Sequence, residues 1–105
     1  MVQEAYRISM KPKKKLDDIR RLALSSPDGN WVELGVYKGG SALLLSKLKG
    51  DRTLYLADSY EGLPEPGKND IGLNCTKKGK KHKKGDICGT LKEVKKVMIE
   101  ESNIK

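Results

Sequence analysis

The chain has 105 residues and a mass of 11.7 kDa, which is enough for one small domain at most. Its formal net charge is +8, its longest uncharged apolar run is far shorter than the ~20 residues of a membrane span, and no apolar signal segment follows Met1. These features argue against a membrane protein, a secreted disulfide scaffold and a coiled coil, and we expect a basic, cytoplasmic globular segment.

Hydrophobic periodicity and turn residues predict a helix, a strand, a helix, a strand, a long loop and a final helix. No clear period runs through the first 12 residues. The helices are expected over residues 13–24, 41–49 and 90–101, and the strands over residues 31–36 and 53–57. Residues 58–74 are predicted to form a loop, which continues into a lysine-rich loop over residues 75–86.

This order of elements predicts an α/β fold with a Rossmann-like, doubly wound parallel sheet, because a strand–helix–strand unit with short connections makes a right-handed parallel crossover. Residues 1–28 would form an N-terminal helical segment and residues 29–105 a partial domain. Two strands alone do not make a parallel sheet covered on both faces. The sheet therefore looks truncated after its second strand and the following helix, and a further strand should follow Ile104. We expect the open edges to cause self-association, pairing with a complementing chain or a poorly cooperative fold.

The first informative motif runs from Glu33 to Ser41 and reads Glu-Leu-Gly-Val-Tyr-Lys-Gly-Gly-Ser. An acidic residue stands near the end of the predicted strand, and a glycine-containing turn leads into a helix whose first N–H groups are free. Gly35 lacks a Cβ and so lets the backbone approach a ligand, while Gly39 and Gly40 allow unusual dihedral angles. The spacing differs from that of dinucleotide sites, and a Glu33 carboxylate would repel a pyrophosphate but hold an ammonium group. The motif favours a nucleotide-like ligand with a cationic amino-acid end; the alternative is a turn that only tightens helix packing.

Asp58 is the second candidate, because it ends the second predicted strand 23 residues after Gly35. In doubly wound sheets an acid at about this distance accepts hydrogen bonds from ribose hydroxyls. The alternative for such an aspartate is a turn or cap residue.

The string Asp-Ser-Tyr-Glu-Gly-Leu-Pro, which begins at Asp58, is more specific. With the first motif it resembles the macrocin O-methyltransferase family of class I S-adenosylmethionine-dependent methyltransferases, over roughly Gly29 to Ile104. The resemblance implies an N-terminal cofactor-binding half in which the first motif contacts the methionine part of S-adenosylmethionine, Asp58 contacts the ribose hydroxyls, and the next two residues lie beside the adenosine. The cofactor-binding residues expected on this basis are Glu33, Gly35, Gly39, Gly40, Ser41, Asp58, Ser59 and Tyr60.

The function that the resemblance implies is methyl transfer to a hydroxyl of a sugar or another small molecule, so the expected partner is a small-molecule acceptor. Family members commonly use a divalent metal held by acidic residues after the fourth strand, which this chain does not reach, and we assign no metal ligand here. No catalytic base is assigned either, since His82 is the only imidazole and lies among lysines. Whether the chain is an enzyme or a non-catalytic remnant stays open.

The lysine-rich loop offers a further alternative, a basic module that binds nucleic acid. Residues 77–84 include six lysines that could contact phosphates, but no aromatic residue lies among them for base stacking. A solvated loop is the favoured interpretation, and nucleic acid is not the expected partner. Cys75 and Cys88 lack the paired spacing of a zinc site, and Trp31 is expected in the core, with the cofactor edge as the alternative.

Overall fold

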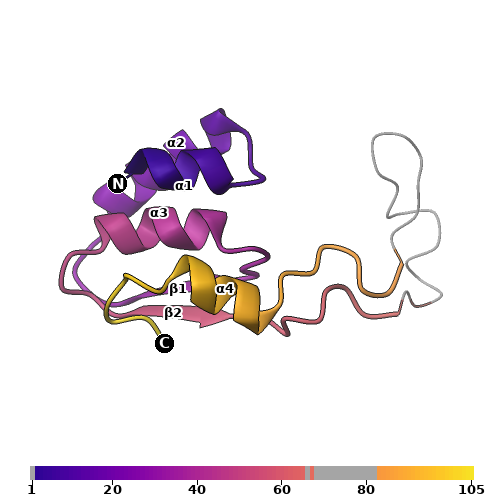
Figure 1. The fold of residues 1–105 in the computed structure, drawn as a ribbon. Coiled ribbons are helices and arrows are strands. Elements are labelled where there is room, and N and C mark those ends of the chain that lie inside the picture. Colours follow the sequence, from indigo (N-terminus) through magenta and orange to yellow (C-terminus); the bar gives the residue numbers. More distant parts are fainter. Residues whose placement is uncertain (1, 66, 68–82) are drawn as a thin grey trace.

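The computed structural model describes residues 2–65, 67 and 83–105, and this part of the chain forms a small α/β fold (Figure 1). Strands β1 and β2 run parallel, with Trp31 opposite Leu54 and Leu34 opposite Ala57. Helix α3 connects them, so the predicted parallel crossover is confirmed. The elements are α1 (Val2–Ile8), α2 (Lys13–Leu24), β1 (Trp31–Leu34), α3 (Gly40–Leu48), β2 (Leu54–Ala57) and α4 (Leu91–Val97).

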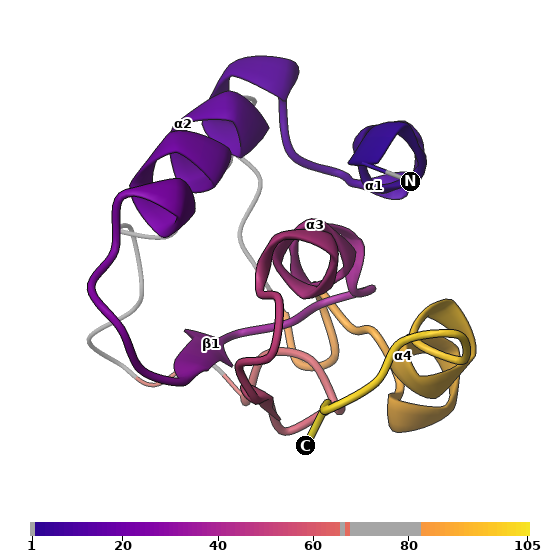
Figure 2. The ribbon, with the colours of Figure 1, turned by 90° about the vertical axis from the view of Figure 1, so that its left-hand side faces the viewer.

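Helices α1 and α2 lie on the side of α3 that faces away from the sheet (Figure 2). Helix α1 was not predicted from the sequence, because its seven residues are too few to show a period and too few for a stable isolated helix. Packing stabilises it instead: Ala5 is completely buried, and Tyr6 and Ile8 pack against the core. The N-terminal segment is thus helical almost from its start.

Two predicted elements end earlier than expected. Strand β1 ends at Leu34 rather than at residue 36, since the Gly35 amide still donates to the Ala57 carbonyl (2.8 Å) but the Val36 amide turns to the Asp58 side chain. Helix α4 ends at Val97 rather than at residue 101, because the chain turns there and brings Glu101 back to α3.

An isolated parallel bridge pairs the C-terminal residues with β2. Ile104 forms a parallel bridge with Leu54, and the Lys105 amide donates to the Leu54 carbonyl at 2.9 Å. The sequence predicted a further strand after Ile104, and the described residues show this single bridge at that point. The sheet itself has two strands, β1 and β2.

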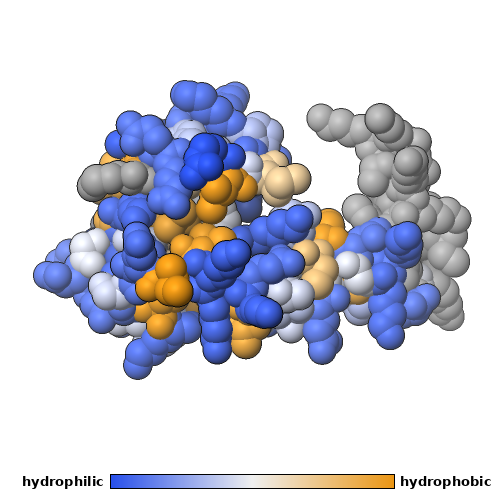
Figure 3. Space-filling view, viewed as in Figure 1, coloured by the Kyte–Doolittle hydropathy of each residue, from blue (hydrophilic) through white to orange (hydrophobic). Residues whose placement is uncertain are grey.

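The two faces of the sheet differ in burial. The face toward α3 contributes to a core that includes Leu16, Leu44 and Leu54, which are at most 1% exposed. Side chains alternate along a strand, so Val32, Leu34 and Tyr55 point to the opposite face, where they are 60%, 78% and 43% exposed. On the side of the molecule drawn in Figure 1, the surface is mostly hydrophilic with apolar patches between the hydrophilic side chains (Figure 3). Among the described residues, the second face of the sheet is therefore bare.

Glu101 joins the C-terminal segment to α3. Its carboxylate accepts hydrogen bonds from Ser46 Oγ (2.6 Å) and Lys47 Nζ (2.8 Å), and the side chains of Glu101 and Lys47 are only 9% and 22% exposed. Burial by itself would raise the pKa of Glu101, but the hydrogen bonds from Lys47 and Ser46 lower the pKa below its ordinary value of 4.5. The pair therefore stabilises the folded chain when Glu101 is ionised.

Glu101→Gln is expected to lower the free energy of unfolding by about 1.5–3 kcal/mol at neutral pH, because a hydrogen-bonded charge is removed from a largely buried pair. A carboxylate whose pKa is lower in the folded than in the unfolded chain stabilises the fold at a pH above its unfolded-state pKa. This stability is lost as the pH falls through its folded-state pKa. The difference between the two proteins in urea unfolding should consequently be full at pH 7 and shrink below about pH 4.5. Glu100→Gln, at an exposed neighbour, is the matched control, and an equal loss in both variants would contradict the pairing.

Candidate cofactor site

Of the two glycines expected to have unusual dihedral angles in the turn between β1 and α3, Gly39 has a positive φ and Gly40 does not. Gly35 has φ +84° and Gly39, the N-cap of α3, has φ +92°, a region that other residues rarely adopt. A Cβ placed on Gly35 would meet no atom within 4 Å, so the backbone at this position faces open space. The turn therefore offers a ligand direct access to the backbone at the carboxyl end of β1.

Gly40 has a packing role that the sequence did not indicate. A Cβ on this residue would stand 2.5 Å from the Cα of Ser9, which lies in the linker between α1 and α2. The absent side chain lets the linker pass against the start of α3. The predicted contact with a ligand stays a prediction, but the packing of Ser9 is by itself a sufficient reason for glycine here.

Glu33 lies on the covered face of β1, where Ser41 Oγ donates a hydrogen bond to its Oε1. The other carboxylate oxygen, Oε2, is buried and has no hydrogen-bond partner among the described residues. Burial raises the pKa of Glu33, while the hydrogen bond from Ser41 and the charge of Lys11 oppose this rise. A buried acceptor without a partner costs free energy. A hydrogen bond from a cationic ligand to Glu33 Oε2 would remove that cost.

Asp58 lies at the carboxyl end of β2 beside the glycine turn, as the spacing predicted. Its Oδ2 accepts hydrogen bonds from the backbone amides of Val36 (2.7 Å) and Tyr37 (3.1 Å), and its Oδ1 accepts one from Tyr60 (3.0 Å). The Tyr60 amide is the main cause of a pKa below the ordinary value of 3.8; burial opposes this shift, and the amides of Tyr37, Val36 and Ser59 lower the pKa further. Asp58 thus connects the two loops that follow the strands, and its contact with a ribose stays a prediction.

Ser59 and Tyr60 stabilise the turn after β2. Ser59 Oγ accepts a hydrogen bond from the Glu61 amide (3.2 Å) and donates one to the Gly62 carbonyl (3.4 Å). Tyr60 has φ +61°, and its hydroxyl donates to the Leu56 carbonyl at 3.3 Å. These contacts give both residues a role in stabilising the turn. The adenosine contact implied by the resemblance stays a prediction.

The linker between α1 and α2 was missed by the sequence analysis and lies at the predicted site. Lys11 Nζ donates a hydrogen bond to Ser41 Oγ at 3.1 Å. The linker and the glycine turn enclose a cavity of about 200 Å³, lined by Ile8, Ser9, Met10, Lys11, Val36, Tyr37, Lys38, Gly40 and Ser41. No sequence signal marks Lys11, because it is one of several lysines around Pro12 and its position depends on how α1 packs on α3.

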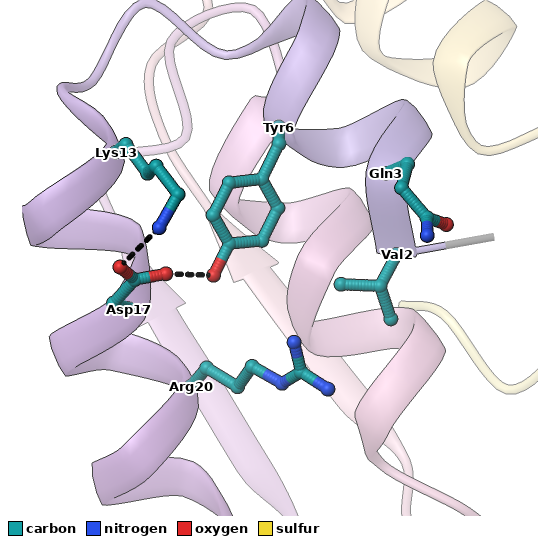
Figure 4. A pocket seen from close by; sticks show the side chains of 6 residues that line it. All are labelled: Val2, Gln3, Tyr6, Lys13, Asp17 and Arg20. Atoms are coloured by element: carbon teal, nitrogen blue, oxygen red, sulfur yellow. Dashed lines mark hydrogen bonds and ion pairs between the residues drawn. The ribbon is translucent and has the colours of Figure 1, made fainter.

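A larger cavity of about 640 Å³ lies between α1 and α2, lined by Val2, Gln3, Tyr6, Lys13, Asp17 and Arg20 (Figure 4). Tyr6 reaches from α1 to Asp17 on α2, and its hydroxyl donates to the carboxylate at 2.6 Å. Lys13 donates to the same carboxylate at 2.9 Å. None of the predicted cofactor residues lines this cavity, so its size alone does not connect it with the motifs.

Other candidates from the sequence lie away from the site or outside the described residues. Trp31 begins β1 at the opposite end of the strand, where its Nε1 donates to Ser26 Oγ (3.1 Å) and the Arg52 guanidinium lies 4.8 Å from its ring centre. It is half-buried and lies outside the core cluster in which it was expected. Cys88 is half-buried and its thiol donates to the Tyr60 carbonyl. Cys75, His82 and most of the lysine-rich loop lie outside the described residues.

Metal-ligating side chains do not gather anywhere in residues 2–65, 67 and 83–105, where no three His, Cys, Asp or Glu residues are grouped so as to hold an ion. In the same ranges, every helix is too short or too polar to cross a membrane.

Comparison with known proteins identifies a family and similar O-methyltransferases. Residues 5–98 match the family model of macrocin O-methyltransferase (TylF). Over 65 residues the chain is 32% identical to demethyldecarbamoylnovobiocin O-methyltransferase of Streptomyces niveus, a match that covers 53% of this chain and 25% of that protein. The solved structure of the O-methyltransferase NovP superposes with a TM-score of 0.69 at 23% identity, covering 92% of this chain and 45% of NovP. The described fold thus corresponds to less than half of the NovP chain.

Proposed function

Because the chain belongs to the macrocin O-methyltransferase family, we propose that it forms the cofactor-binding half of an S-adenosylmethionine-dependent O-methyltransferase that acts on a small-molecule hydroxyl. The chain spans a quarter of the curated relative and under half of the solved one. Residues for the acceptor, for a divalent metal and for proton removal are not assigned among the described residues. The proposal therefore concerns cofactor binding, and catalysis would need the groups that complete the domain.

The observation that carries the proposal is the convergence of Glu33, the glycine turn and Asp58 at the carboxyl ends of two adjacent parallel strands. Ligands of open α/β sheets bind at this edge. Glu33 Oε2 is buried and accepts no hydrogen bond from the part of the chain that the structure describes, which suits the ammonium group of the cofactor, and the open space at Gly35 suits its close approach. When bound, S-adenosylmethionine supplies an activated methyl group on a sulfonium, and the residues of this chain bind and orient that cofactor.

Asp58 contributes to this site first by holding its shape. Its three hydrogen bonds to backbone amides keep the glycine turn beside the turn after β2. A site in which both loops are held before the ligand arrives loses less conformational entropy on binding. We propose that the adenosine lies across these two loops, with its ribose toward Asp58.

The proposal predicts saturable binding of S-adenosylhomocysteine, measured by titration calorimetry on the purified chain. Glu33→Gln should weaken binding by about tenfold or more, because a charge-assisted hydrogen bond to the ammonium group is lost while the amide still accepts from Ser41. Asp51→Asn removes one negative charge at an exposed turn and should leave binding unchanged. Absence of binding by the folded wild-type chain would overturn the proposal and favour a non-catalytic remnant.

A further inference from the structure

We propose that Lys11 binds the carboxylate of the cofactor's amino-acid end, which makes the linker between α1 and α2 part of the cofactor site. The inference rests on the proposed function, and it goes beyond the cofactor-binding residues expected from the two sequence motifs, none of which is a cation. It assigns a ligand-binding role to the N-terminal segment, whose residues precede both motifs.

The position of Lys11 supports this role. Its Nζ donates to Ser41 Oγ at 3.1 Å, and Ser41 Oγ in turn donates to Glu33, so that a cation, a hydroxyl and a carboxylate form one chain of hydrogen bonds. Lys11 and Ser41 are 30 residues apart, and both line the cavity of about 200 Å³ next to the glycine turn. The two charged groups of this hydrogen-bonded series come from different elements: Lys11 lies in the linker and Glu33 lies in β1.

The linker is held in place by contacts that do not involve a ligand. The Lys11 amide donates to Ser9 Oγ at 3.1 Å, and the absent side chain of Gly40 lets Ser9 lie against the first turn of α3. Ile8, at the end of α1, packs against the core. Lys11 is therefore attached to a positioned backbone and is not a side chain on a loose terminus.

The chemistry of the two charged groups matches a zwitterion. An amino-acid end carries an ammonium group and a carboxylate on the same carbon, so its site needs one anion and one cation a few ångströms apart. Glu33 has a buried oxygen that no described residue hydrogen-bonds, and a lysine ammonium has three donors, one of which Lys11 uses on Ser41. Lys38 lines the same cavity, but its Nζ lies 5.6 Å from the Tyr37 ring centre in a cation–π arrangement. Lys11 is consequently the cation best placed for the carboxylate.

The test compares two ligands that differ only in this carboxylate: S-adenosylhomocysteine and its decarboxylated analogue, S-adenosyl-3-thiopropylamine. Lys11→Met should weaken binding of S-adenosylhomocysteine by about tenfold, since one charge-assisted hydrogen bond is lost. Binding of the decarboxylated analogue should stay unchanged or tighten, because that ligand keeps only the ammonium group. Lys11→Arg, which retains a cation, should preserve most of the preference for the carboxylate.

Two controls separate this effect from general damage. Lys14→Met removes the same charge from an exposed position on α2 and should leave both affinities unchanged. Far-ultraviolet circular dichroism of Lys11→Met should match that of the wild type. Equal weakening of both ligands by Lys11→Met, or no effect on either, would overturn the role of Lys11 while leaving the proposed function in place. Failure of the wild type to bind either ligand would overturn both.

Gly40→Ala provides an independent variant in which Lys11 is kept. The added Cβ would collide with Ser9, so the linker must move and carry Lys11 away from Ser41. Affinity for S-adenosylhomocysteine should fall more than affinity for the decarboxylated analogue. Unchanged selectivity in this variant, with a displaced linker, would count against the proposal.

Discussion

Replacing Asp58 by alanine is expected to lower the free energy of unfolding by about 2–3 kcal/mol and to abolish measurable binding of S-adenosylhomocysteine. One ionised side chain accepts three backbone hydrogen bonds, from Val36, Tyr37 and Tyr60, and hydrogen bonds to charged groups contribute about 1.5–3 kcal/mol each where they are buried. Asp58 is half-buried, so water replaces part of the loss. The affinity for the ligand should fall more than the stability, because Asp58 no longer holds the two loops of the site together.

The pH dependence of this effect has a definite sign. The pKa of folded Asp58 lies below 3.8, so its contribution to stability is present above the unfolded value and is lost as the pH falls through the folded value. Urea unfolding of the wild type and Asp58→Ala should differ by a constant amount near pH 7 and converge as the pH falls below about 4.

Two further variants make the Asp58 experiment decisive. Asp58→Asn keeps one oxygen acceptor without the charge and should fall between the other two proteins in stability. Asp51→Ala, at an exposed turn, should match the wild type. Identical unfolding of Asp58→Ala and the wild type would show that the carboxylate does not hold the loops together.

The second large effect is expected from Leu44→Ala, which should lower the free energy of unfolding by about 2–5 kcal/mol. Leu44 is completely buried on α3, and the total free energy of unfolding of a small domain is only about 5–15 kcal/mol. The same truncation at Leu34, which is 78% exposed, should cost under about 0.5 kcal/mol. Urea unfolding at low protein concentration measures both.

The Leu34 variant also tests the expectation of self-association through the open sheet. Val32, Leu34 and Tyr55 form an apolar face that the described residues leave bare, and such faces favour contact with another chain. If the chain associates, stability should rise with protein concentration, and Leu34→Ala should reduce that rise. Stability independent of concentration, together with a monomeric mass in sedimentation, would contradict the expectation.

Much of the fold was predictable because its signals are local in the sequence. The apolar spacing of α2 and the short apolar runs of β1 and β2 lie within windows of a dozen residues or fewer, and Gly35 and Gly39 adopt the positive φ angles that their residue type allows. Element ends were less predictable. The end of β1 depends on the Val36 amide, which bonds to the side chain of Asp58, a residue 22 positions later.

The candidate site was predicted in its location but not in its contacts. Glu33, the glycine turn and Asp58 could be placed at one sheet edge, because parallel strands carry their carboxyl ends to the same side. The side chain of Asp58 could not be assigned to backbone amides from the sequence, since an aspartate after a strand has the same local pattern whether it binds a ligand or anchors a loop.

The sequence by itself determined the parallel crossover, the two motifs and the family of this protein, because periodicity, turn chemistry and motif spacing are properties of neighbouring residues. Only the tertiary structure decided that α1 forms, that Gly40 makes room for Ser9 and that Lys11 reaches Ser41. These features depend on contacts between residues about 30 positions apart, and such contacts arise from the packing of α1 and α2 on α3 and not from any local pattern.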